Sequence, residues 1–228
     1  MTAPTPTPTP KRIWIIDTET TGLPPRRVPP QYSTEWERCR VVQLAWRVYE
    51  LRGENGDRPS LLESGNFLVN PQGAFTIPEQ AEKIHGISTA KATELGVSFG
   101  DVLIPIISRL MSETTLVVAH NTEFDINVIA SELYRNGHED LGDRFTIKPS
   151  HCTMKNNTRR GERWPRLRDL YIRVFGREPE GTLHDADTDV QVCSDIYFAT
   201  TLTPSSNVDA VAVGVSPLPM VEGRRQAQ

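Results

Sequence analysis

Five residues in three distant segments have side chains suited to metal-dependent chemistry. Asp17 and Glu19 lie in IIDTETTG, Asp125 ends AHNTEFD, and His184 and Asp189 lie in LHDADTD. Carboxylate oxygens are hard ligands that suit Mg²⁺ or Mn²⁺, and a histidine beside them can take a proton from water. The set predicts a site that holds two divalent cations against a phosphate backbone.

The first two carboxylates follow a predicted buried strand. The continuous apolar run IWII (13–16) is typical of a strand that is covered on both faces. Residues two apart in a strand point to the same face, so Asp17 and Glu19 are expected to project together. Their charges repel each other, and a bound cation would remove that cost. The alternative is a polar strand end whose carboxylates are simply exposed to solvent.

Asp125 is predicted to lie in the first turn of a helix that follows a short apolar strand. The strand is LVVAH (116–120), and the helix follows Thr122 and ends at Gly137. Ligands gather at the carboxyl ends of strands in α/β proteins, which favours a functional Asp125. The alternative is a capping box, because Thr122 and Asp125 have the spacing of one.

The third segment, LHDADTD, resembles a helix start. Thr182 and Asp185 have the spacing of a capping box, which predicts His184 in the first helical turn and Asp189 little more than one turn later. An imidazole in this position, beside metal-binding carboxylates, could deprotonate a water molecule. The alternative is that the acids favour a helix N-terminus and the histidine is a surface residue. We interpret Asp185 and Asp187 in that second way.

The remaining elements must complete a sheet and its helical cover. VVQLAWRVYEL (41–51) alternates apolar and polar residues and predicts a half-buried strand, while Asn-Gly in ENGD (54–57) predicts a hairpin turn. Helices are predicted from Ser98, with a kink at Pro105, and over RLRDLYIRVFG (166–176). Hairpin strands followed by interleaved strands and helices indicate an α/β fold with a mixed sheet.

Length and composition indicate one globular domain in a chain of 228 residues, over residues 11–202. Residues 1–10 are a Thr/Pro-rich arm and residues 203–228 a polar, proline-containing tail, and both are expected to be disordered. No apolar run approaches the roughly 20 residues that span a bilayer, and no secretory signal is evident, so a cytoplasmic protein is expected. The three cysteines form no CxxC pair and are expected to be reduced.

The charge distribution is uneven. The net charge of −4 by itself argues weakly against nucleic-acid binding. Residues 155–173, however, contain Glu162 and Asp169 against a majority of basic residues: Lys155, Arg159, Arg160, Arg163, Arg166, Arg168 and Arg173. This stretch could follow a phosphate backbone, or it could be a solvated loop and helix face.

Three motifs in this order resemble one enzyme family. DTETTG (17–22), HNTEFD (120–125) and HDADTD (184–189), together with KIHGIS (83–88), are similar to motifs of the DEDDh branch of the DnaQ-like 3′–5′ exonucleases. The resemblance implies a ribonuclease H-like mixed sheet of about five strands flanked by helices. It also implies two cations, Mg²⁺ or Mn²⁺, and a catalytic set in which four acids are metal ligands and the histidine is the general base: Asp17, Glu19, Asp125, Asp189 and His184.

The resemblance further implies contacts with the substrate. Thr20 and Leu23 would hold and wedge the terminal base, and His85 would reach the terminal nucleotide. For His85 a helix C-cap is an equal alternative. Asn121 and Phe124 would shape the pocket, although Phe124 could instead be a core residue.

The implied activity is release of nucleoside monophosphates from the 3′ end of single-stranded or frayed DNA by two-metal phosphodiester hydrolysis. Such an enzyme, of the DNA polymerase III epsilon type, would act in DNA replication or repair, in proofreading or end trimming, with a possible polymerase partner. The alternatives are a 3′–5′ exoribonuclease and a non-catalytic, polymerase-associated nucleic-acid-binding module.

The chain departs from the family pattern in two places. Segment 23–40 is longer and richer in proline than usual, and forms either a flap beside the active site or a surface loop. The basic run 155–168 is expected to guide the nucleic acid.

Overall fold

The fold is a mixed five-stranded sheet covered by helices, seen in a computed structural model that describes residues 11–52 and 58–202. The predicted arm, the predicted turn at 54–57 and the predicted tail lie outside the described residues. The strand order is β3-β2-β1-β4-β5; β1, β4 and β5 are parallel, and β2 is antiparallel to both β1 and β3. The strands are β1 Lys11–Thr20, β2 Val41–Arg52, β3 Arg58–Leu68, β4 Leu116–Ala119 and β5 Ser150–Cys152.

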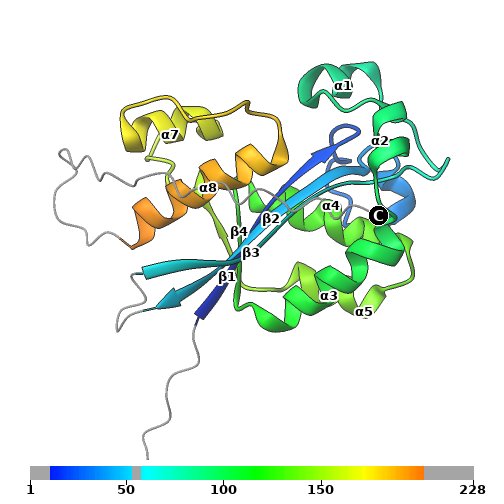
Figure 1. The fold of residues 1–228 in the computed structure, drawn as a ribbon, viewed down its shortest axis with the longest axis horizontal. Coiled ribbons are helices and arrows are strands. Elements are labelled where there is room, and N and C mark those ends of the chain that lie inside the picture. The colour runs from blue at the N-terminus through cyan, green and yellow to red at the C-terminus, as the bar shows by residue number, and fades with distance from the viewer. Residues whose placement is uncertain (1–10, 53–57, 203–228) are drawn as a thin grey trace, which may run out of the picture.

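Helices cover both faces of the sheet (Figure 1). α7 and α8 lie on one side and α3 and α5 on the other, while α1 and α2 lie at the end toward which β1 points. None of the described helices is both long and apolar enough to cross a membrane. The helices are α1 Glu79–His85, α2 Thr89–Leu95, α3 Ile104–Glu113, α4 Thr122–Arg135, α5 Glu139–Thr146, α6 Thr153–Asn156, α7 Leu167–Phe175 and α8 Ala186–Thr201, with a 3-10 turn at Ser33–Trp36 and a π-helical turn at Phe99–Leu103.

The central strand β1 is buried on both faces, as its apolar run predicts. All four residues of 13–16 have no exposed surface. Trp14 and Ile16 pack into the cluster that also contains core residues of α3, α4 and α5, whereas Ile13 and Ile15 pack against α8. The two covered faces hold the carboxyl end of β1 in place between layers of helix.

The prediction of a half-buried β2 is wrong. Leu44 and Trp46 join the cluster under α3 and α4, but Ala45 on the other face is also fully buried, because α8 covers it. Even Gln43, a polar residue of that second face, is only 5% exposed. In β2 the polar residues of the alternating pattern therefore lie on the face that α8 covers. Gln43 on this face is held by hydrogen bonds and not by contact with water.

The predicted helix after Ser98 is confirmed, together with its interruption. The Ser98 hydroxyl accepts a hydrogen bond from the Asp101 backbone N–H at 3.1 Å. The chain then makes the π-helical turn before α3 begins at Ile104, and Pro105 lies in the first turn of α3. A proline is tolerated there because its missing N–H would have no partner within the helix.

Candidate metal centre and active site

β1 delivers the first two carboxylates at its carboxyl end. Asp17 and Glu19 lie on the same face of the strand, which faces α8, and both are partly buried. Thr18, on the opposite face, is directed toward α4, where its hydroxyl donates to Asp125 Oδ1 at 2.8 Å. The strand therefore connects to two of the helices that carry the other predicted residues.

α4 places Asp125 without using it as a cap. The capping-box alternative is wrong, because α4 begins at Thr122 and the Thr122 hydroxyl donates to the carbonyls of Ala119, at 3.0 Å, and His151, at 2.9 Å. The N-cap residue is Asn121, whose left-handed φ of 73° turns the chain from β4 into the helix. Asp125 is 2% exposed, so its carboxyl group is buried.

α8 begins later than predicted. Its first residue is Ala186, so the expected capping box of Thr182 and Asp185 is not formed and His184 precedes the helix. His184 has a φ of 65°, a conformation that costs a residue with a Cβ about 1–2 kcal/mol. Its backbone N–H donates to Asp189 Oδ2 at 3.3 Å, and its side chain is exposed to solvent. The turn before α8 thus presents an accessible imidazole beside a buried carboxylate.

These segments converge on one cluster. Ligand atoms of Glu19, His184 and Asp189 lie within 4.8 Å of one another. Asp189 is 8% exposed, and its buried Oδ1 has no hydrogen-bond partner among the described residues. A buried carboxylate oxygen without a partner is costly unless a ligand satisfies it.

Charge within the cluster is uncompensated. Burial raises the pKa of Asp17 well above its usual range, and the charges of Asp125, Asp189 and Glu19 raise it further. Burial and the neighbouring acids raise the pKa of Glu19 to about 8. The pKa of Asp125 rises to about 7, mainly through burial and despite the hydrogen bond from Thr18. Burial raises the pKa of Asp189 to about 6, although His184 opposes the shift.

No lysine or arginine in the described part of the chain forms an ion pair with any of these four acids. Divalent cations fit such a donor set, because oxygen ligands are what Mg²⁺ and Mn²⁺ prefer and a cation supplies the missing charge.

Gln43 is a site-forming residue that the sequence analysis missed. Its side-chain amide donates to Asp185 Oδ1 at 2.9 Å and to Asn66 Oδ1 at 2.8 Å, and its carbonyl accepts from the Ala186 N–H at 3.4 Å. Gln43 pairs with Glu19 across β1 and β2. A polar residue inside the apolar run VVQLAW was the available signal, and it ties the start of α8 to the sheet.

Asp185 and Asp187 lie at the start of α8, as N-cap and first-turn residue, in agreement with their interpretation as helix-start acids, but they also have partners in the sheet. Asp187 forms an ion pair with Arg47 of β2, at 3.3 Å between carboxylate and guanidinium. Asp185 accepts the hydrogen bond from Gln43 and has no capping contact of its own with the α8 backbone. Both acids therefore dock α8 on β2, which the sequence alone could not reveal.

Two of the predicted substrate-contact residues lie in the connections that follow β1 and β4. Leu23 is 83% exposed. Asn121 lies at the start of α4. Phe124 is partly buried and packs against the main core, in agreement with the alternative prediction that it is a core residue. The role of these residues in substrate binding stays a prediction.

His85 lies closer to the cluster than its helix-end position suggests. It is the last residue of α1 and its Nδ1 accepts from the Ile87 N–H at 3.1 Å, while Gly86 takes the left-handed conformation of a C-cap. Burial lowers the pKa of His85, the Thr20 backbone raises it, and the charge of His184 lowers it. The ring is thus within electrostatic range of both Thr20 and His184, and the C-cap alternative does not exclude a contact with substrate.

Segment 23–40 is packed against α4. Trp36 is 2% exposed and its indole N–H donates to the Pro29 carbonyl at 3.3 Å. The Arg135 guanidinium of α4 donates to the Ser33 carbonyl at 2.6 Å. The segment is therefore a fastened surface loop rather than a free flap.

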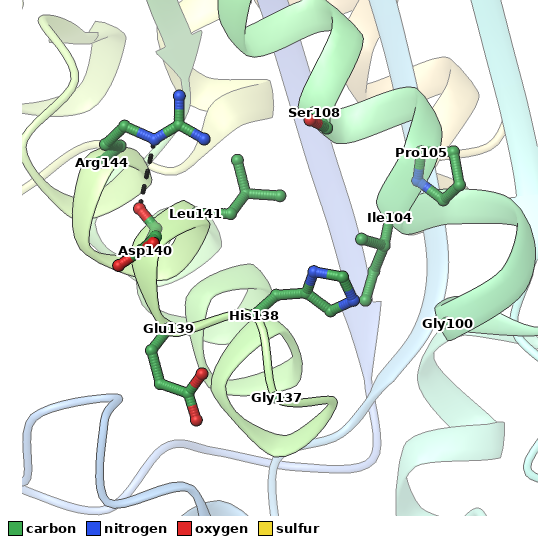
Figure 2. Close-up of a pocket in the computed structure, with 10 residues that line it drawn as sticks. All are labelled: Gly100, Ile104, Pro105, Ser108, Gly137, His138, Glu139, Asp140, Leu141 and Arg144. Atoms are coloured by element: carbon green, nitrogen blue, oxygen red, sulfur yellow. Dashed lines mark hydrogen bonds between the residues drawn. The ribbon is translucent and has the colours of Figure 1, made fainter.

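A pocket of about 490 Å³ lies away from these residues. Figure 2 shows it between α3 and α5, with the His138 ring directed toward Ile104 and the Arg144 guanidinium hydrogen-bonded to the Asp140 carbonyl. None of the five predicted catalytic residues lines it. The pocket and the carboxylate cluster are separate features.

A mixed five-stranded sheet with this order, with acids at the carboxyl end of its central strand, is a ribonuclease H-like fold. A sequence profile of the RNase T family, described as "Exonuclease", matches residues 14–197. The chain belongs to this family of metal-dependent 3′–5′ exonucleases and is a DnaQ-like domain of the DEDDh type. The predicted family and fold are confirmed. No curated protein sequence matches the chain significantly.

Several solved structures share the fold. A zinc-bound complex of E. coli Exonuclease I with single-stranded DNA has a TM-score of 0.62 and 20% identity, over 83% of this chain and 40% of that chain. Exonuclease I from Methylocaldum szegediense has a TM-score of 0.56 and 20% identity, over 83% of this chain and 40% of that one. The chain thus spans about 40% of the length of these two proteins. At this identity the likeness concerns the fold.

Proposed function

We propose that this chain is a metal-dependent 3′–5′ exonuclease that releases nucleoside monophosphates from the 3′ end of single-stranded or frayed DNA. The observation that carries the proposal is the cluster of four acids without a countercharge, with the exposed imidazole of His184 beside Asp189. Single-stranded DNA is favoured because structures similar to this one, those of E. coli Exonuclease I, contain it. A role in replication or repair, with a polymerase partner, is part of the same proposal.

The carboxylates of Asp17, Glu19, Asp125 and Asp189 would hold two cations, Mg²⁺ or Mn²⁺, which would offset the charge of the acids and of the scissile phosphate. His184 would accept a proton from the attacking water as that water adds to phosphorus and the bond to the departing 3′ oxygen breaks. The hydrogen bond from its backbone N–H to Asp189 Oδ2, at 3.3 Å, supports this role, because it keeps the His184 backbone beside one of the acids. To accept this proton, the His184 ring must offer a nitrogen that carries none.

The terminal nucleotide would lie between the two connections that follow β1 and β4. Leu23, with its exposed side chain, would wedge against the terminal base, and Thr20 would contact it. His85 would approach from α1, while Asn121 and Phe124 would shape the other wall. These contacts are mainly apolar and to the backbone, so little sequence preference is expected.

The test is degradation of 5′-labelled DNA and RNA oligonucleotides with Mg²⁺, Mn²⁺ or a chelator. Wild type is expected to produce a 3′-end ladder on DNA that requires metal and is lost in Asp17→Ala. Asp101→Ala, which removes an exposed acid of the π-helical turn, is the matched control and should retain the ladder. A ladder on RNA alone would show that the substrate is RNA and not DNA. Failure to degrade either polymer with any metal would refute the proposed activity.

A further inference from the structure

One tryptophan of this protein is on the surface. The chain has four tryptophans, of which Trp14, Trp36 and Trp46 are at most 2% exposed, whereas Trp164 is 64% exposed. A single exposed apolar residue is common in proteins and by itself indicates nothing. The surroundings of Trp164, however, combine a rigid support with unpaired positive charge.

The loop that carries Trp164 is held at both of its sides. The carbonyl of the next residue, Pro165, lies 3.0 Å from His120 Nε2. On the other side, Arg173 of α7 forms an ion pair with Glu162 at 3.1 Å and donates to the Asn157 carbonyl. A ring on a fastened loop loses little entropy when a ligand stacks on it.

The same contacts place the loop on the active-site edge of the sheet. His120 directly follows β4 and directly precedes Asn121, the N-cap of α4. Lys155 Nζ lies 5.9 Å from the centroid of the Trp164 ring and 2.7 Å from Glu123 Oε2, in the first turn of α4. Trp164 therefore borders the helix start that carries Asp125.

Three arginines without an ion pair among the described residues lie within four positions of Trp164 in the sequence. Arg160, Arg163 and Arg166 are exposed, and their guanidinium groups form no ion pair within the residues that the structure describes. Other basic residues of the stretch do have acidic partners: Arg159 pairs with Glu162 at 4.0 Å. In a chain with a net charge of −4, a local excess of free guanidinium groups is suited to a polyanion.

We propose that Trp164 is a stacking platform for a base of the single strand on the 5′ side of the scissile bond, with Arg160, Arg163 and Arg166 on its phosphates. The inference rests on the proposed function and adds to it a binding subsite outside the catalytic cluster. Aromatic rings bind any base through its π-face, and each stacked base contributes about 1–3 kcal/mol. The subsite would hold the strand during successive cleavages without selecting a sequence.

Intrinsic fluorescence tests the contact itself, because Trp164 is the exposed member among four tryptophans. Wild type and Trp164→Phe are titrated with dT12 in the presence of a chelator, while labelled dT12 reports binding by anisotropy. We expect the long-wavelength emission of wild type to be quenched as dT12 binds, and that component to be absent from Trp164→Phe. Unchanged wild-type emission at dT12 concentrations that saturate the anisotropy signal would overturn the proposal, as would the absence of dT12 binding.

Cleavage of oligonucleotides of different length separates this subsite from the catalytic cluster. For Trp164→Ala we expect kcat/KM on dT12 to fall about tenfold, with a smaller loss on dT2, since a dinucleotide has a single base on the 5′ side of the scissile bond. Arg58→Ala removes an exposed arginine at the other end of the sheet and is the matched control, with no loss expected. Equal loss on dT2 and dT12, or loss on neither, would overturn the subsite. Wild type that cleaves neither would instead refute the proposed function, and the fluorescence titration would still test the contact.

Discussion

Helix α4 buries two carboxylates, Asp125 and Glu132, each 2% exposed, and surrounds them in opposite ways. Glu132 receives the Arg40 guanidinium through two hydrogen bonds, at 2.7 and 3.2 Å, and a third from the Val41 backbone N–H at 3.3 Å. Arg135 lies 3.1 Å from the same carboxylate.

Asp125 receives a side-chain hydrogen bond from Thr18 and lies near backbone N–H groups of Thr18 and Asp125, but no arginine or lysine of the described residues pairs with it, and the charge of Asp189 opposes its ionisation. A buried charge paired with arginines is structural, whereas a buried group of acids without a basic partner is suited to a cation from outside the chain.

The largest expected difference concerns activity. Asp125→Asn keeps the shape of the side chain but weakens cation binding, and a cation contributes several kcal/mol to stabilising the transition state. We expect the rate on a 5′-labelled oligonucleotide to fall about 10³-fold or more, while the metal-free variant melts at the same temperature as wild type or higher. A variant that melts well below wild type would show that Asp125 is structural, like Glu132.

At Glu132 and its two arginines, a substitution is expected to change the stability of the fold. Arg40→Met leaves Glu132 buried with only Arg135 nearby, so we expect a loss of about 3 kcal/mol in the free energy of unfolding, measured by urea denaturation. Arg12→Met is the control, because Arg12 pairs with Glu50 at a more exposed position and should cost less than about 1 kcal/mol. Equal losses in the two variants would remove the distinction between buried and exposed pairs.

The group of acids around Asp125 also predicts that the free energy of unfolding depends on pH. The folded-state pKa of Glu19 is raised to about 8, so the metal-free folded protein binds more protons than the unfolded chain between about pH 4.5 and pH 8. Stability contributed by Glu19 is therefore lost as pH rises through this range. We expect Glu19→Gln to exceed wild type by about 2 kcal/mol at pH 8.5 and by much less at pH 4.5. A difference independent of pH would contradict the raised pKa.

A smaller effect is expected at Gln43, which holds the start of α8 and is not one of the predicted metal ligands. Gln43→Met removes the hydrogen bonds to Asp185 and to the Ala186 N–H at similar volume. We expect kcat to fall about tenfold, since each such bond contributes about 1 kcal/mol, with KM little changed. Wild-type kcat in this variant would show that α8 holds its place without Gln43.

Local patterns predicted much of this molecule because they depend on neighbours in the sequence. The apolar run of β1, the helix start at Ser98 and the spacing of Asp17 and Glu19 all depend on a few adjacent residues. The order of the three motifs, through the family that it resembles, also predicted which distant segments come together. That family and its fold are confirmed.

Contacts between distant segments were out of reach. The Thr18 hydroxyl meets Asp125 across 107 positions of sequence, and Gln43 meets Asp185 across 142. The two predicted capping boxes do not form for the same reason. The Thr122 hydroxyl donates a hydrogen bond to the His151 carbonyl, and the Asp185 carboxylate accepts one from Gln43 of β2. A short polar motif states what a side chain can do, and the tertiary structure decides which partner it meets.

Binding of Mn²⁺ to the metal-free protein, followed by calorimetry near pH 7 in buffers of different ionisation enthalpy, tests the cation site most directly. Because the pKa values of Glu19, Asp125 and Asp189 are raised to about 8, 7 and 6, Mn²⁺ must displace protons as it binds. We expect binding with proton release in wild type and in Asp101→Asn, and its loss in Asp17→Asn. Absence of binding at millimolar Mn²⁺, or equal binding by Asp17→Asn, would contradict a cation site built from these carboxylates.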